Sequence, residues 1–172
     1  MTTKIAQPVK AQLELQTILF RRVLSDITDD EANKPFADHL IPIKWIAGHL
    51  VNTRISLWSI LTGKAVDPDY AKLFGKGTSG ITGQSFPEIN EILEKWESVS
   101  SELMESIENC TDDFLMSKPP FQTSIPDNTM IGLIAFMTTH EAQHTGQISV
   151  MRSLASAPVS SGFRLYQSVI CN

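Results

Sequence analysis

Four long segments of the chain repeat apolar residues every three or four positions, which is the spacing of one face of an α-helix. They cover residues 9–27, 42–62, 85–110 and 128–156. Pro42 is suited to a first helical position, and Ser85 and Glu88 have the spacing of a Ser-x-x-Glu capping box. Strand signals between the segments are weak. The pattern predicts an all-α fold, a four-helix bundle in which each helix buries one apolar stripe.

The connection between the second and third segments is long and rich in glycine, with Gly75, Gly77, Gly80 and Gly83 inside residues 63–84. It is too long for a hairpin between antiparallel neighbours. We therefore expect a crossover loop that leaves helices two and three parallel, in an up-down-down-up order. Thr-Asp-Asp at 28–30 recurs at 111–113, each time followed by Lys-Pro, as two similar helical hairpins would produce.

Composition narrows the class of protein and its partners. The chain has 172 residues, of which 42% are hydrophobic, so we expect a single domain over residues 1–172. A net charge of −5 argues against nucleic acid as a partner. The chain has no apolar stretch of about 18 residues, and its first residues have no signal-peptide core, so we expect neither a membrane span nor export. Cys110 and Cys171 form no C-x-x-C pattern, which favours a reduced, cytoplasmic protein.

The string His140-Glu141-Ala142-Gln143-His144 lies late in the fourth segment and satisfies H-E-x-x-H, a zinc-peptidase signature. Its two histidines lie one helical turn apart, at the two positions where the apolar stripe of this segment has no apolar residue. Burying both rings costs free energy unless their nitrogens find partners. A shared metal ion satisfies one nitrogen on each ring, so the pair favours a metal site.

The rest of the sequence contradicts the peptidase reading. No Asp, Glu or His follows His144, so a third side-chain ligand must lie upstream. The upstream candidates are His39, His49 and many carboxylates. His39 precedes the break at Pro42 and is expected in a loop, whereas His49 lies on the flank of helix two. Gly48 beside it indicates that another element approaches closely there.

Three neutral imidazoles would leave a divalent ion, zinc or nickel, with at least one open position. Water at such a position becomes acidic enough to act as a nucleophile, and a substrate thiol can displace it and ionise. The expected site is therefore catalytic in form.

The chain resembles the DinB/YfiT-like superfamily of metal-dependent four-helix-bundle proteins over nearly its whole length. The resemblance rests on Trp45-Ile46-Ala47-Gly48-His49-Leu50, on the nine residues from His140 to Ile148, and on Met151-Arg152. It implies a bundle, often a homodimer, with a divalent metal held by the histidines that correspond here to His49, His140 and His144. It also implies relatives that transfer or isomerise with low-molecular-weight thiols such as bacillithiol or mycothiol.

Four further residues are candidates for the surroundings of the site. Trp45, one turn before His49, is expected to form its wall. Glu141 is expected on the rim or behind a ligand rather than as a general base, and Gln147 to hydrogen-bond near the site or face solvent. Arg152 is a candidate for an anionic substrate group, although a surface or dimer salt bridge is favoured.

The leading hypothesis is a metal-dependent enzyme that acts on a small molecule, as a thiol-dependent S-transferase or a hydrolase. One alternative is a non-catalytic stress-response or binding module with a structural or vestigial metal site. A more remote alternative is an H-E-x-x-H zinc peptidase. The sequence names no catalytic residue, substrate or pathway.

Overall fold

The computed structural model describes residues 4–34, 41–78 and 85–156, and every regular element in these ranges is a helix. The elements are α1 (Gln7–Leu24), α2 (Asp29–Asn33), α3 (Ile43–Thr62), α4 (Pro68–Phe74), α5 (Ile89–Glu108), α6 (Asp112–Met116) and α7 (Met130–Ser156). The all-α prediction is confirmed. Among the helices described, none is long and apolar enough to cross a lipid bilayer.

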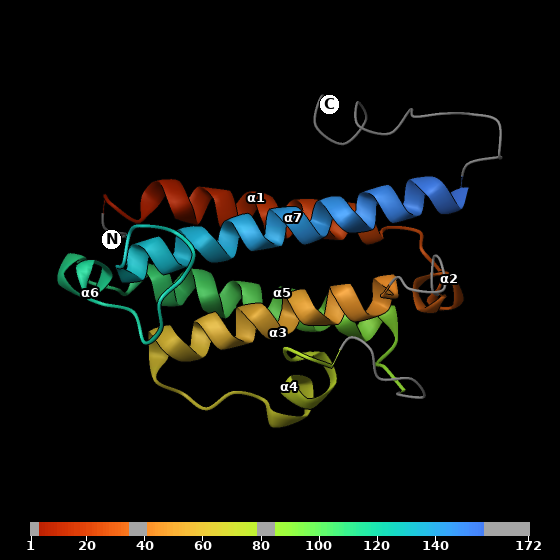
Figure 1. Ribbon diagram of the computed structural model, residues 1–172, viewed down its shortest axis with the longest axis horizontal. Coiled ribbons are helices and arrows are strands. Elements are labelled where there is room, and N and C mark those ends of the chain that lie inside the picture. The colour runs from red at the N-terminus through yellow and green to blue at the C-terminus, as the bar shows by residue number, and fades with distance from the viewer. Residues whose placement is uncertain (1–3, 35–40, 79–84, 157–172) are drawn as a thin grey trace.

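The four long helices, α1, α3, α5 and α7, lie lengthwise beside one another (Figure 1). Helix α1 packs against α7 and α5, and α3 packs against α5 and α7. Each corresponds to one of the four apolar-periodic segments, with ends that differ by a few residues. Short helices α2 and α6 lie near opposite ends of the long ones, and α4 lies beside α3 (Figure 1).

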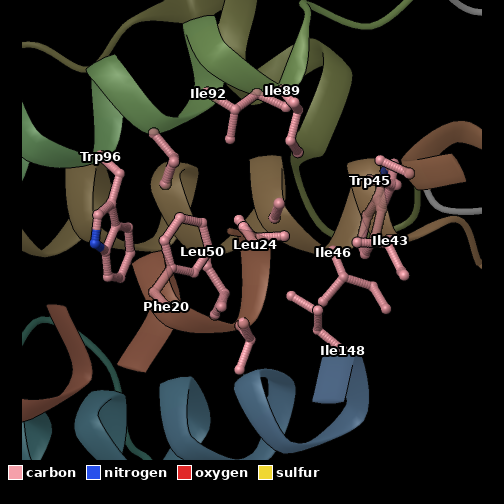
Figure 2. Close-up of a cluster of buried hydrophobic side chains, with 14 of the residues drawn as sticks. Phe20, Leu24, Ile43, Trp45, Ile46, Leu50, Ile89, Ile92, Trp96 and Ile148 are labelled. Carbon is pink, nitrogen blue, oxygen red and sulfur yellow. The ribbon is translucent and has the colours of Figure 1, made fainter. Parts of the chain in front are cut away.

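Side chains from all four long helices meet in the core that Figure 2 shows. Trp96 of α5 is fully buried and stacks on Phe20 of α1, with ring centroids 4.1 Å apart. Leu50 of α3 and Ile148 of α7 are also fully buried within this cluster. Burial of a large apolar side chain contributes about 1.5–3 kcal/mol, so a few such residues per helix hold the layers together.

Helix α5 begins later than its sequence pattern predicted. Its N-cap is Glu88, whose backbone N–H donates to the Glu91 carboxylate at 2.7 Å, so the capping box joins Glu88 to Glu91. The predicted box of Ser85 and Glu88 is wrong. The reason lies at Pro87, because a residue that precedes proline is disfavoured in helical conformation. Phe86 therefore stays outside the helix.

Three short helices lie in connections where the apolar pattern predicts no helix. Helices α2 and α6 each begin at a threonine N-cap, Thr28 and Thr111, which accounts for the repeated Thr-Asp-Asp. Helix α4 lies within the long connection between α3 and α5, so this connection is not a bare loop. Asp67 caps α4 by accepting the backbone N–H groups of Asp69 and Tyr70.

Candidate metal centre

Helices α3 and α7 bring three imidazole rings together. The Nε2 atom of His140 lies 3.4 Å from Nε2 of His49 and 3.1 Å from Nε2 of His144. All three side chains are half-buried, and a ligand atom from each lies within 4.8 Å of the others. The pairing of His49 with the two late histidines, expected from the sequence, is thus present. His39, the other candidate, lies outside the described residues.

The hydrogen bonds at Nδ1 fix which nitrogens face inward. Nδ1 of His49 lies 2.8 Å from the carbonyl oxygen of Phe74, and Nδ1 of His144 lies 2.7 Å from Oε1 of Gln147. Because each oxygen accepts a hydrogen bond, each Nδ1 carries the proton. In the neutral rings the Nε2 lone pairs then point toward the centre of the cluster, which is the tautomer a metal ligand needs.

The spacing of the Nε2 atoms fits a single metal ion. With metal–nitrogen bonds of about 2.0–2.1 Å, neighbouring ligands are about 3.3 Å apart in a tetrahedron and about 2.9 Å apart in an octahedron. The separations from Nε2 of His140 fall in or next to this range. Hydrogen bonding cannot explain both contacts, since a neutral ring has either one proton or one lone pair at Nε2.

Burial favours the neutral forms of His140 and His49. It lowers the pKa of His140 to about 4, with smaller contributions from His144 and His49. It also lowers the pKa of His49, against an opposing effect of the hydrogen bond to Phe74. Nδ1 of His140 is buried without a hydrogen-bond partner among the described residues, so a second proton on this ring would be poorly solvated. Near neutral pH these two rings therefore offer free lone pairs.

Helix α4 shapes one side of the cluster. A Cβ atom placed on Gly48 would lie 2.2 Å from a ring atom of Phe74, which confirms the close approach inferred from this glycine. Trp45 stacks on His49, with ring centroids 4.9 Å apart and planes 10° apart. Its indole N–H points to the Leu73 carbonyl at 3.2 Å and the Thr78 hydroxyl at 3.1 Å. Trp45 therefore lies against the cluster, as expected for a wall.

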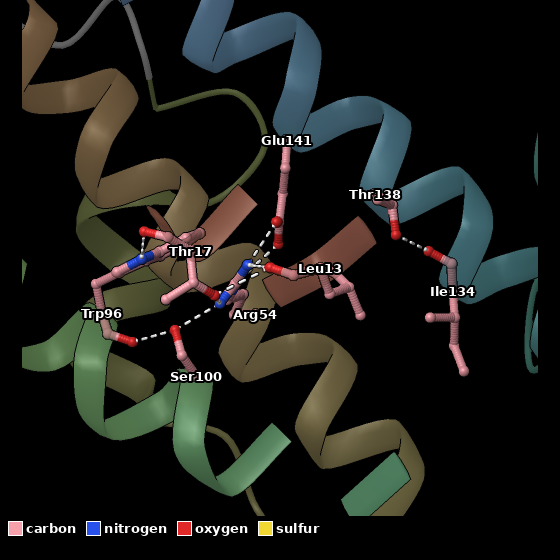
Figure 3. A network of polar contacts seen from close by, with 8 residues as sticks. All are labelled: Leu13, Thr17, Arg54, Trp96, Ser100, Ile134, Thr138 and Glu141. Atoms are coloured by element: carbon pink, nitrogen blue, oxygen red, sulfur yellow. Dashed lines mark hydrogen bonds and ion pairs between the residues drawn. The ribbon is translucent and has the colours of Figure 1, made fainter. Parts of the chain in front are cut away.

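The side chain of Glu141 points from α7 toward Arg54, in the interior between the helices (Figure 3). Its side chain is 1% exposed, and its two oxygens accept from Nε and Nη2 of Arg54, each at 2.8 Å. The expected rim position is wrong, because this residue faces the interior of the helical layers. Its carboxylate has no hydrogen bond to any of the three histidines among the described contacts. Because Arg54 holds both carboxylate oxygens, neither is directed at the cluster as a general base would be.

Arg54 is the residue whose importance the sequence reading missed. Its guanidinium is fully buried, lies 3.7 Å from the Trp96 ring centroid, and donates to Thr17, Ser100 and the Leu13 carbonyl as well as to Glu141. The signal was present in the sequence, since Arg54 occupies a place in the apolar stripe of α3 between Leu50 and Leu57.

The two remaining candidates differ in their relation to the cluster. Gln147 is exposed but accepts the Nδ1 hydrogen bond of His144, so it lies directly behind a ligand. Arg152 donates from Nη1 to the carbonyl of Val23 at 2.7 Å, near the end of α1. It lies eight residues, or about 12 Å, along α7 from His144, which puts it with the α1 contact rather than with the cluster.

The chain matches the family model described as the DinB superfamily over residues 12–148, a span that includes all three histidines, Arg54 and Glu141. A solved structure of a conserved protein from Enterococcus faecalis is similar to it, with a TM-score of 0.69 and 15% identity. The match covers 88% of this chain and 97% of that one. At this identity the likeness bears on the fold alone. No curated protein matches the chain.

Proposed function

Because this chain belongs to the DinB superfamily, we propose that it is a divalent-metal-dependent enzyme that acts on a small molecule. The observation that carries the proposal is the convergence of three Nε2 atoms from His49, His140 and His144. A zinc or nickel ion held by these three histidines would supply a Lewis-acid centre with an open position, and it would lower the pKa of a thiol or water bound there. The reaction classes that fit are thiol-dependent S-transfer and hydrolysis.

Protein groups around the cluster prepare it for this role. The carbonyl of Phe74 and the amide of Gln147 hold the Nδ1 protons, so that the lone pairs of His49 and His144 stay directed inward. Trp45 covers one face of His49 and excludes water from it. Rigidly held imidazoles lose little conformational entropy when they bind an ion, which raises affinity.

The charge of the ligand set favours an anionic substrate group. Within the described residues, the potential metal-binding group consists of three histidines and contains no carboxylate or thiolate. Three neutral ligands leave the charge of a divalent ion uncompensated, so the open position attracts an anion. A low-molecular-weight thiol that ionises on binding meets this requirement, and we propose such a thiol as co-substrate.

The peptidase alternative loses its general base. In that mechanism the glutamate of H-E-x-x-H activates water beside the metal. Here both carboxylate oxygens of Glu141 are occupied by Arg54 in the core. No comparable observation favours the alternative of a non-catalytic module, which would require a closed coordination sphere.

We also propose that the four long helices form an up-down-down-up bundle in one domain over residues 1–172. Support comes from the extensive packing of α3 against α5 and of α1 against α7. In Figure 1, α3 and α5 both run from the right end to the left, and α1 and α7 run the other way. The connection that contains α4 then acts as the crossover.

A homodimer through α1 and α7 is our proposal for the assembly. Leu15 and Ile18 on α1, and Val150 and Leu154 on α7, are exposed apolar side chains. Exposed apolar patches commonly mark interaction surfaces. Light scattering should give twice the chain mass for wild type and a lower mass for a Leu15→Glu, Val150→Glu variant. A monomeric wild type would contradict the proposal.

The cytoplasmic location expected from cysteine usage stays a prediction.

Metal analysis tests the main proposal. Purified protein should contain or take up about one zinc or nickel ion per chain, and addition of the ion should raise the melting temperature. The His49→Ala and His144→Ala variants should lose both effects, whereas His39→Ala, the matched control, should keep them. Equal metal content in all four proteins would refute the site.

The thiol is tested separately on protein loaded with Co²⁺. Titration with bacillithiol or cysteine should produce a thiolate-to-metal charge-transfer band, and the S-methyl derivatives should not. The same absorption with both kinds of compound would rule out a thiolate at the open position.

A further inference from the structure

The contact between α3 and α7 contains two polar clusters, the histidines and the Arg54–Glu141 ion pair. Arg54 follows His49 by five residues, and Glu141 directly follows His140. At about 100° per residue, Arg54 lies about 140° around α3 from His49, and Glu141 lies about 100° around α7 from His140. The two clusters therefore lie on different sides of the line along which these helices touch.

The contact between α3 and α7 is smaller than the largest contact that each of these helices makes with another long helix. Helix α3 packs more extensively against α5, and α7 against α1, than α3 and α7 pack against each other. Yet the histidine cluster spans α3 and α7, so its geometry depends on their relative rotation and register. A two-pronged ion pair is sensitive to both, since its parallel hydrogen bonds require coplanar groups.

Arg54 is itself held from several directions. Each of its five N–H groups has an acceptor: two go to Glu141, two to the hydroxyls of Thr17 and Ser100, and one to the carbonyl of Leu13. The guanidinium is thus fixed relative to α1 and α5 as well as α3. Glu141, and with it α7, is placed against a rigid group.

We propose that Arg54 and Glu141 are positioning residues for the histidine cluster. Their ion pair sets the rotation and register of α7 against α3, so that Nε2 of His49 meets those of His140 and His144. The consequence for metal affinity rests on the proposed function, whereas the placement of the rings does not.

The test uses a variant that removes the pair without leaving a buried charge. In the Arg54→Met, Glu141→Leu double variant, apolar side chains replace both ions, an exchange that is often neutral or stabilising. Thr17 and Ser100 lose Arg54 as a donor, but each hydroxyl still donates to a carbonyl within its own helix, Leu13 and Trp96, so neither is left without a hydrogen-bond partner. The double variant should therefore fold.

Nuclear Overhauser effects between histidine ring protons report the placement in metal-free protein. Wild type should give contacts between the ring of His140 and those of His49 and His144. The double variant should lose the His49–His140 contact, which joins two helices, and keep the His140–His144 contact within α7. Persistence of the His49–His140 contact in the double variant would overturn the proposal.

Metal affinity gives the second measurement. Co²⁺ should bind the double variant about tenfold or more weakly than wild type, with an altered visible spectrum, as for the loss of other groups that orient metal ligands. Unchanged affinity would also overturn the proposal. If wild type itself bound no Co²⁺, the proposed function would fail, and the ring contacts would still decide the placement.

Two further variants separate placement from stability. Arg54→Lys keeps a charge beside Glu141 but loses the two-pronged geometry, so it should weaken Co²⁺ binding while the protein stays folded. If the double variant does not fold, Arg54→Lys provides the test in its place. The matched control is Lys44→Met with Asp29→Leu, which removes an ion pair of 2.6 Å between α3 and α2. The control should leave the ring contacts and the Co²⁺ spectrum as in wild type.

Discussion

His49 and Phe74 are joined by a hydrogen bond from a ring N–H to a backbone carbonyl, 2.8 Å long. The two residues come from different helices, since His49 lies on α3 and Phe74 ends α4. The ring of Phe74 is fully buried and lies over Gly48, directly before His49. Phe74 thus orients His49 through its backbone carbonyl and covers the helix surface at Gly48 with its ring.

Gly48→Ala should disturb both functions of Phe74. The added Cβ would lie 2.2–2.5 Å from three atoms of the Phe74 ring. That ring cannot move freely, because it also packs against Tyr70 and Phe86. We expect the free energy of unfolding to fall by about 1–3 kcal/mol, as for other overpacked cores, and zinc affinity to fall as α4 shifts. Urea unfolding and calorimetric titration measure the two effects.

Gly146→Ala is the matched control, with the opposite sign. A Cβ on Gly146 would meet nothing within 4 Å, and the residue lies inside helix α7. Alanine is favoured over glycine in a helix interior by about 1 kcal/mol, so stability should rise by up to this amount. A loss of stability in this variant would show that the glycine is required for another reason.

The metal-free protein should become less stable as the pH falls from about 6.5 to about 4. The pKa of His140 is lowered to about 4, whereas an imidazole in the unfolded chain titrates near 6.5. Between these values the unfolded state binds more protons, so acid favours unfolding. The contribution of the neutral ring is fully present above pH 6.5. The lowered pKa of His49 acts in the same direction.

Urea unfolding of metal-free protein at about pH 7 and about pH 5 measures this dependence. The His140→Gln variant should show a smaller difference between the two conditions, since glutamine does not titrate. An equal difference in both proteins would mean that other groups cause the acid sensitivity.

Gln147→Leu should weaken metal binding with little effect on folding. The variant removes the acceptor that holds the Nδ1 proton of His144 at 2.7 Å. Loss of such a partner commonly reduces metal affinity by about tenfold or more, whereas an exposed side chain contributes little to stability. Gln143→Leu, one turn earlier on the exposed side of α7, should bind zinc as wild type does. Equal affinities in the two variants would argue against the role of Gln147.

Trp45 should report metal binding by its fluorescence. Its ring stacks on His49 at 4.9 Å, so a paramagnetic ion such as Co²⁺ in the cluster should quench its emission at close range. Trp45→Phe should remove most of the quenching. Trp58→Phe should keep it, because Trp58 lies nine residues, or about 13 Å, along α3 from His49. Quenching that disappeared only in the Trp58 variant would place the ion elsewhere.

Apolar periodicity was enough to find the four long helices, because each buries a stripe whose spacing is set by helix geometry. The same signal could not find α4, since a helix of seven residues is too short to repeat a stripe. Its start depends instead on the local cap at Asp67 and on Pro68 at the first turn. The late start of α5 at Glu88 and Glu91 likewise depends on side-chain hydrogen bonds.

His140 and His144 were predictable because polar rings inside an apolar stripe need partners. His49, on the flank of its helix, was one of two upstream histidine candidates, and the family resemblance singled it out. The hydrogen bond from His49 to Phe74 was not predictable, since any residue type supplies a backbone carbonyl. Glu141 was misplaced for a different reason. Glu141 directly follows His140, so its position in the sequence suggests a place beside the metal. Its partner Arg54 lies 87 positions away and cannot be identified from neighbouring residues. Only the packing of α7 against α3 and α1 determines which side of α7 faces the core.

The saturated guanidinium of Arg54 also bears on how the chain folds. Its acceptors come from α1, α5 and α7, so an intermediate that lacked any one of these helices would bury a cation with unmet hydrogen bonds. Such partly assembled states are therefore high in free energy, and the long helices should fold in one cooperative step. Amides of the four helices around Arg54 should then exchange with solvent through a common global opening rather than helix by helix.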